Sequence, residues 1–287
     1  MTEKSIREYD RVADRIRLHR QIDKSPVVIV EGPSDVLLLN RAFPHKWTFF
    51  PAGTRLVALQ AVRDLNGWGT REFIGVVDRD FDDDVRECEE QGLPILPYEN
   101  ADIEAMLANG KAYSVLLDEL GSSEKISKGG GVRAILQATQ KAVEPIARLR
   151  RANFENQWGL AFDKVDVASK VDPKTLQLKL QPYCAALSAT VSHDPAQSLL
   201  LDYATGKKTP SHTPSCPHGS EPYYRGRDLL AVTGVALRAL AGSCPRNITD
   251  AEHLAKVLRL TATAFIYHSK WGSELVEHLQ ADASDGK

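Results

Sequence analysis

The chain has 287 residues, of which 43% are hydrophobic and 26% charged, and its formal net charge is −2 at pH 7, so it is long enough for a substantial core and is not an overall polyanion binder. No apolar run reaches the roughly 18 residues of a membrane-spanning helix, and the charged segment at residues 1–21 lacks the apolar centre of a signal peptide, so we expect a cytoplasmic protein. The four cysteines, Cys88, Cys184, Cys216 and Cys244, form no CxxC pair, which argues against a disulfide framework.

Short apolar runs suited to buried strands alternate with helical patterns in the first part of the chain. After an expected helix at 3–22, the expected strands are 26–31, 46–53, 73–77 and 93–100, and the expected helices are 34–43, 54–67 and 101–110. Ser34 is the expected N-cap of the first of these three helices. The prolines of the fourth strand predict a short strand or one close to a sheet edge. This alternation predicts an α/β fold, with a parallel sheet of about four strands flanked by helices.

The remainder of the chain has a mainly helical pattern. A long helix is expected at 132–158, broken or kinked by Pro145, and a hairpin or small strands within 163–184. Residues 205–224 are rich in Pro, Ser, Thr and Gly and are expected to form a loop, with two or three helices after it. The expected organisation is an N-terminal helix at 1–25, an α/β domain at 26–112 and a mainly helical domain at 113–287.

Acidic residues follow three of the expected strands. They are Glu31 after the first strand, Asp78 and Asp80 after the third, and Glu99, Asp102 and Glu104 after the fourth. Because the carboxyl ends of parallel strands open on one edge, where ligands bind in doubly wound sheets, we expect these side chains to lie close together. Asp35, four residues after Glu31, is one helical turn further on and is expected to return to the same place. The run at 82–84 is interpreted as solvated rather than as part of the metal site.

Converging carboxylates repel one another, and cations are needed to hold them together. Hard oxygen ligands in this number suit Mg²⁺ or Mn²⁺. Two such ions can activate a water molecule and stabilise the leaving oxygen of a phosphodiester. The acidic set therefore predicts a site for two metal ions at the carboxyl edge of the sheet.

Three motifs at the expected strand ends resemble the Toprim domain. VEGPSD (30–35) supplies a glutamate after strand one, PAGT (51–54) a glycine after strand two, and VVDRD (76–80) a DxD after strand three. The resemblance covers residues 26–110, about a third of the chain, and it implies a Rossmann-like Toprim sheet.

The spacing of Glu31 and Asp35 resembles the first motif of the OLD (overcoming-lysogenization-defect) nucleases within the Toprim superfamily, which use two metal ions. The resemblance implies that Glu31, Asp78 and Asp80 are catalytic. The implied ligands of two Mg²⁺ or Mn²⁺ ions are Glu31, Asp35, Asp78, Asp80 and Glu104. Glu99 and Asp102 compete with Glu104 for the later acidic position.

YENADIEAML (98–107) and YYRGRDLL (223–230) further resemble the AriB-like effector family of the PARIS anti-phage system, which is encoded beside an AriA-like ABC-type ATPase. The resemblance implies a toxin-like nuclease effector of a two-component abortive-infection system, activated by or released from its ATPase partner. The substrate would be host nucleic acid, with RNA such as tRNA favoured because no motif for reading duplex DNA is present. A homodimer built on the C-terminal helices is expected for the free protein.

Arginines at two places are candidates for nucleic-acid contacts. Arg148, Arg150 and Arg151 cluster in ARLRRANF, and Arg227 is proposed as the basic residue that the OLD nucleases use. A cluster of this kind is either a solvated helix face or a phosphate-contacting patch, and both interpretations stay open.

Other functions receive less support from the sequence. No GxxxxGK[ST] motif is present, so the chain is not expected to hydrolyse ATP in the Walker manner. His212, Cys216 and His218 have a poor spacing for zinc, and a plain loop is favoured there. The alternatives are a non-catalytic Toprim module that binds nucleic acid or partners, and a phosphatase or phosphotransferase that uses the same metal cluster.

Overall fold

The computed structural model describes residues 11–193, 195–211 and 222–284, with side chains up to residue 280. The chain divides into two compact units. The sheet unit comprises residues 1–79, 83–98 and 263–287, and the helical unit comprises residues 80–82 and 99–262. Part of the expected N-terminal helix, residues 3–10, and the candidate zinc residues His212, Cys216 and His218 lie outside the described residues.

The sheet unit contains a four-stranded, all-parallel sheet in the order β2-β1-β3-β4. Its strands are β1 (Val27–Val30), β2 (Thr48–Pro51), β3 (Phe73–Val77) and β4 (Ile95–Pro97). All residues of β1 and β3 are buried, as expected for central strands covered on both faces. The proline-containing β4 has three residues and lies at an edge, as its prolines predict. The prediction of an α/β fold with a parallel sheet is confirmed.

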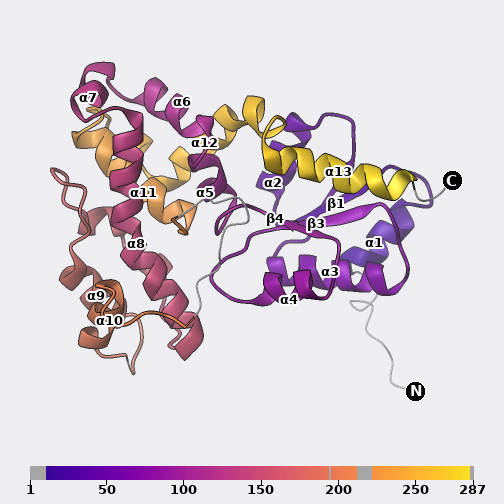
Figure 1. Cartoon of the computed structure of the whole chain (residues 1–287), viewed down its shortest axis with the longest axis horizontal. Coiled ribbons are helices and arrows are strands. Elements are labelled where there is room, and N and C mark those ends of the chain that lie inside the picture. Colours follow the sequence, from indigo (N-terminus) through magenta and orange to yellow (C-terminus); the bar gives the residue numbers. More distant parts are fainter. Residues whose placement is uncertain (1–10, 194, 212–221, 285–287) are drawn as a thin grey trace. The chain divides into compact units, whose positions relative to one another are not determined.

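Helices cover both faces of the sheet. Figure 1 shows α1, α3 and α4 on one side of the strands, and α2 and α13 on the other. The bounds of these helices are Val12–His19 for α1, Pro33–Ala42 for α2, Arg55–Gly67 for α3, Asp84–Glu90 for α4 and Lys270–Ser284 for α13. At Gly75 in β3, an added Cβ would lie 2.6 Å from Cγ2 of Val62, so only glycine lets α3 pack this closely on the sheet.

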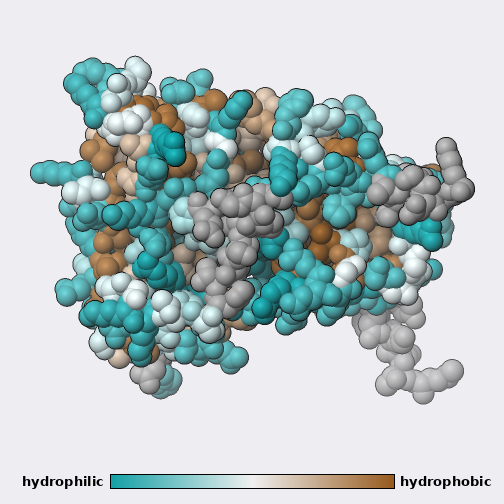
Figure 2. Space-filling model, in the orientation of Figure 1, coloured by the Kyte–Doolittle hydropathy of each residue, from teal (hydrophilic) through white to brown (hydrophobic). Residues whose placement is uncertain are grey.

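The helical unit consists of eight α-helices and three short 3₁₀-helices among the described residues. They are α5 (Ile103–Ala108), α6 (Lys111–Leu120), α7 (Ser123–Lys128), α8 (Val132–Asn156), η2 (Phe162–Lys164), η3 (Val167–Lys170), α9 (Leu180–Ser188), α10 (Gln197–Ala204), α11 (Gly226–Ala239), η4 (Arg246–Ile248) and α12 (Ala251–Ile266), whose last turn belongs to the sheet unit. The long helix α8 packs against α10 and α11. On the face drawn in Figure 2, hydrophilic residues predominate and apolar side chains show between them.

Two expectations for the helical region need correction. α8 passes through Pro145 without a break, because the rest of its turns keep their hydrogen bonds and its apolar face is buried. The small strands expected within 163–184 reduce to one antiparallel bridge between Val171 and Leu178, followed directly by α9. Of the two outcomes expected at Pro145, the break is therefore wrong, and the pairing expected within 163–184 is limited to this one bridge.

Candidate functional site

Two carboxylate-bearing strand ends meet at the switch point of the sheet. The chain passes from β1 to β2 on one side and then to β3 on the other side of β1. Ligands bind outside the carboxyl ends of the strands at such a point. Glu31 directly follows β1 and Asp78 directly follows β3, and Oε1 of Glu31 accepts a hydrogen bond from the backbone N of Asp78 at 2.7 Å. These two predicted site residues therefore lie together at the expected edge.

Asp35 is held in the first turn of α2 beside this pair. Its Oδ2 accepts a hydrogen bond from the backbone N of Gly32 at 2.9 Å, and the residue is only 7% exposed. Gly32 is the N-cap and Pro33 the first helical residue, so the expectation that Ser34 caps α2 is wrong. Proline is pre-set for the first helical position, and the Asp35 carboxylate supplies the missing acceptor. The bond fixes Asp35 next to the residue that follows Glu31.

Two arginines of the sheet unit hold the backbone that follows β3. Arg55, the first residue of α3, donates from Nη1 to the carbonyl of Arg79 at 3.2 Å and lies 3.4 Å from Asp84. Arg79 donates to the carbonyl of Tyr98 at 3.2 Å and forms an ion pair with Glu89 at 3.0 Å. Asp84 starts α4, a helix that is absent from the expected elements. Both arginines therefore fix the path of the chain around the DxD motif.

Asp80 lies in the helical unit and has a left-handed backbone, with φ of 48°. A non-glycine residue rarely adopts this conformation, and its surroundings must enforce it. The backbone N of Asp80 donates to the carbonyl of Ala101 at 2.9 Å, and its own carbonyl accepts from the hydroxyl of Tyr223. The strained backbone of the second DxD aspartate is thus held from two sides.

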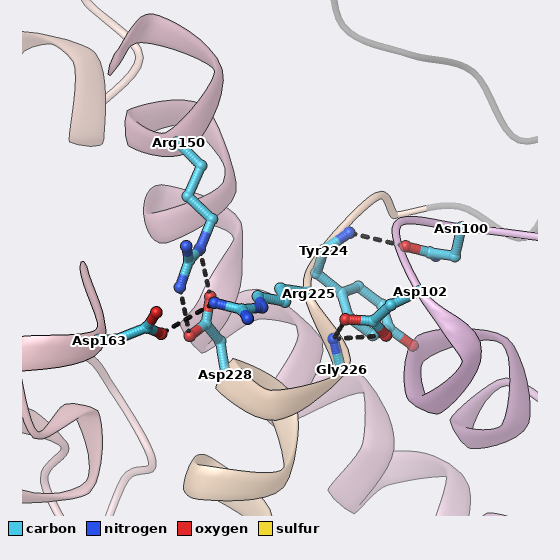
Figure 3. Close-up of polar contacts among 8 residues, drawn as sticks. All are labelled: Asn100, Asp102, Arg150, Asp163, Tyr224, Arg225, Gly226 and Asp228. Atoms are coloured by element: carbon cyan, nitrogen blue, oxygen red, sulfur yellow. Dashed lines mark hydrogen bonds and ion pairs between the residues drawn. The ribbon is translucent and has the colours of Figure 1, made fainter. Parts of the chain in front are cut away.

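The acidic segment after β4 is anchored by the start of α11 and the residues just before it (Figure 3). Asp102 is the N-cap of α5 and accepts from the backbone N of Ala105 at 2.8 Å. Its two carboxylate oxygens also accept from the backbone N of Gly226, each at 3.0 Å. Oδ1 of Asn100 accepts from the backbone N of Tyr224 at 2.9 Å. The segments at 99–107 and 223–230, which carry part of the family resemblance, are therefore bonded to each other.

Asp102 and Glu104, which compete for the later acidic position, have different surroundings. Burial, together with the nearby charge of Glu104, raises the pKa of Asp102 to about 8. Its oxygens accept three hydrogen bonds from the backbone N atoms of Ala105 and Gly226, as expected for a structural N-cap. Glu104 instead forms an ion pair with Arg259 of α12, and its side chain is 12% exposed. Sequence reasoning missed Arg259, because only the fold brings α12 beside α5.

The predicted nucleic-acid-binding arginines are placed differently from one another. Arg150 makes a double contact with Asp228, at 2.8 and 3.0 Å, and Arg151 donates to the carbonyl of Phe81 at 2.9 Å and is 3% exposed. Arg148, half-buried, donates to the carbonyl of Ala204 at 2.9 Å. Arg227 is exposed. The ARLRRANF cluster is thus bound mainly to the interior of the helical unit, and Arg227 presents its charge to solvent.

The predicted carboxylate ligands match Mg²⁺ in donor type. Glu31, Asp35 and Asp78 belong to the sheet unit, and Asp80 and Glu104 to the helical unit. Within the part of the chain that the structure describes, no group of three or more His, Cys, Asp or Glu side chains is gathered as a metal-binding cluster. The two-metal site and its ligand set stay predictions.

Comparisons with known proteins found no matching family model and no matching curated protein. Among the described residues, no helix has the length and apolar character needed to span a membrane.

Proposed function

We propose that the chain is a Toprim-type, metal-dependent endonuclease that hydrolyses phosphodiester bonds. The observation that carries the proposal is the pair Glu31 and Asp78, joined by a 2.7 Å hydrogen bond at the carboxyl ends of two neighbouring parallel strands. These strands flank the switch point of the sheet, where doubly wound folds bind their ligands. A carboxylate immediately after each of two central strands is expected for a site that binds cations there.

The proposed ligands of two Mg²⁺ or Mn²⁺ ions are Glu31, Asp35, Asp78, Asp80 and Glu104. The ions would supply an activated water and stabilise the leaving oxygen. The backbone N of Asp78 orients the Glu31 carboxylate, and the Asp35 carboxylate fixes the turn between β1 and α2. The fixed backbone of Asp80 keeps the second half of the DxD motif in one conformation.

We further propose a cytoplasmic, toxin-like effector of a two-component anti-phage abortive-infection system, with an AriA-like ABC-type ATPase as the partner that activates or releases it. The absence of a Walker motif in the sequence supports a division of labour in which another chain hydrolyses ATP. The proposed substrate is host nucleic acid, and RNA such as tRNA is favoured. The free protein is proposed to be a homodimer.

The test compares Glu31→Gln and Asp78→Asn with Glu90→Gln. Glutamine keeps an oxygen that can accept the hydrogen bond from the backbone N of Asp78, so Glu31→Gln removes the charge and preserves the local fold. Glu90, 68% exposed at the end of α4, offers a matched control in the same unit. Each protein is expressed with the neighbouring ATPase, and RNA cleavage is measured by sequencing of total RNA and with purified protein in the presence of Mg²⁺.

We expect Glu31→Gln and Asp78→Asn to lose roughly 100-fold or more of the cleavage rate, because each removes charge that is needed to hold the cations. Glu90→Gln should cleave within about twofold of the parent. Full cleavage by both site variants would refute the nuclease mechanism. Retained RNA binding with no Mg²⁺-dependent cleavage by the parent would favour the non-catalytic Toprim module.

A further inference from the structure

A pocket lies entirely within the helical unit, and none of the proposed metal ligands lines it. Its volume is about 310 Å³, at the lower end of the range for small-ligand sites. Arg227, Ala231 and Arg238 line it from α11, and their spacing of four and seven residues places them on one face of that helix. The small side chain of Ala231 leaves space between the two arginines.

Four cationic side chains line the pocket: Lys164, Arg227, Arg238 and Arg246. Lys164 and Arg227 are exposed and, like Arg238, form no ion pair with any described residue. Arg238 is half-buried and donates from Nη1 to Oγ1 of Thr249 at 3.0 Å. Burial and the neighbouring charge of Arg246 lower the pKa of Arg238, and the Asp166 carboxylate offsets part of this effect.

Two of the acidic residues in the pocket wall are already neutralised by arginines that do not line it (Figure 3). Asp228 accepts both bonds from Arg150, at 2.8 and 3.0 Å. Asp163 accepts from Arg225 at 2.9 Å. The Asp228 pair is buried and neutralises that carboxylate, whereas the Asp163 carboxylate is 66% exposed and its pairing is weaker.

The other two acidic residues of the wall are also engaged. Asp250 accepts from the backbone N of Glu252 and His253, at 2.9 and 3.1 Å, at the start of α12. Asp166 lies 3.6 Å from Arg246, and both side chains are more than half exposed, so this contact is weak and easily exchanged. Asp250 keeps its charge, whereas Lys164, Arg227 and Arg238 form no ion pair with a described residue and can contact an incoming anion.

We infer that this pocket binds a phosphate group. Lys164, Arg227 and Arg238, which form no ion pair with a described residue, suit a multiply charged oxyanion, and guanidinium forks match its geometry. The group could arrive as the free phosphate of a nucleotide-like small molecule or as the backbone phosphate of a nucleic acid. The inference goes beyond the proposed nuclease function, since the pocket contains none of the proposed metal ligands.

The test measures binding with EDTA present, so that cleavage plays no part. Pyrophosphate is titrated by calorimetry, and a fluorescent 5′-hydroxyl oligoribonucleotide by anisotropy, each at about 0.1 M salt, where exposed charges are partly screened. The charge-removing variant is Lys164→Ala/Arg227→Ala, whose two side chains are exposed. Its matched control is Arg133→Ala/Lys174→Ala, which removes the same charge from exposed positions of the same unit that do not line the pocket. Ala231→Leu fills the space without changing the charge.

We expect the parent to bind at least one probe, and the control to bind that probe with an affinity within about twofold of the parent. Lys164→Ala/Arg227→Ala and Ala231→Leu should each weaken the affinity about tenfold or more. Circular dichroism checks that all variants keep their helices. If the pocket variants lose affinity for pyrophosphate, the ligand is a small phosphorylated molecule. If they lose affinity for the oligoribonucleotide alone, the ligand is a nucleic-acid backbone. The inference is overturned if the parent binds neither probe at millimolar concentration, or if the control weakens binding as much as the pocket variants. Because no step needs the metal site, an inactive nuclease would leave this result unaffected.

Discussion

Gly226 is the position at which the anchoring of the acidic segment can be tested most directly. It is the first residue of α11, and its backbone N donates to both oxygens of Asp102 at 3.0 Å. A Cβ at this position would clash with the Cβ of Glu104 and would lie 2.5 Å from the backbone N of Ala105 and 2.6 Å from Oδ1 of Asp102. Since a backbone atom is among the clashing neighbours, a side-chain rotation cannot relieve the contact. Gly226→Ala must therefore move α5 and α11 apart.

Two unfavourable contributions determine how far Gly226→Ala lowers the free energy of unfolding. Overpacking in a well-packed site costs about 1–3 kcal/mol, and weakening the hydrogen bonds to a buried carboxyl costs about another 1.5–3 kcal/mol. We therefore expect Gly226→Ala to lower the free energy of unfolding by roughly 3–5 kcal/mol. This is a large part of the 5–15 kcal/mol that is typical of a whole domain.

Urea unfolding followed by circular dichroism and by tryptophan fluorescence measures this loss, and the two signals together reveal whether the two units unfold in one step. Gly67→Ala is the matched control. Gly67 ends α3, nothing lies within 4 Å of its added Cβ, and the residue is exposed, so alanine should leave stability unchanged or raise it by up to about 1 kcal/mol. If Gly226→Ala unfolds within about 0.5 kcal/mol of the parent, which is the range of a neutral surface change, the close approach of α5 and α11 is incorrect.

Three further changes test other contacts of the two units. Arg150→Met should lower the free energy of unfolding in urea by about 3–5 kcal/mol, because it leaves the Asp228 carboxylate, 7% exposed, without its cation. Arg150→Met/Asp228→Leu should recover most of this loss. Equal stability of the single variant and the parent would contradict a buried pair. The folded Asp102 has a pKa of about 8, against an ordinary value of 3.8, and therefore keeps a proton that the unfolded chain releases. The free energy of unfolding should fall as pH rises from about 4 to 8, and Asp102→Asn should flatten this part of the pH profile. An unchanged slope would be evidence against the raised pKa. Trp271→Phe removes the indole N–H that donates to the carbonyl of Pro97 at 3.1 Å, and thermal unfolding should show a loss of about 1–2 kcal/mol, whereas no loss would argue against this bond.

The elements of the sheet unit were predictable because their signals are local. β1 and β3 are short runs of apolar residues buried on both faces, and Thr54 caps α3 by accepting from the backbone N of Val57, as its sequence position suggests. The acidic residues at the ends of these strands follow from the same patterns, so the pairing of Glu31 with Asp78 at one edge could be expected before the fold was known. α4 was missed, because a short helix that begins inside an acidic run has little apolar periodicity to reveal it.

The helical unit shows why charge patterns in a sequence are harder to interpret than apolar ones. Arg150 and Arg151 lie next to each other and suggest a phosphate-contacting patch, yet their partners Asp228 and Phe81 are 78 and 70 residues away along the chain. An arginine with a buried partner and one that awaits an external anion have the same local sequence. Only the fold distinguishes these two kinds of arginine. It shows that Arg150 is paired with Asp228, whereas Arg227 and Arg238 form no ion pair with a carboxylate among the described residues. A search for nucleic-acid contacts in this chain should therefore begin at the face of α11 that carries Arg227 and Arg238, before the basic cluster in α8.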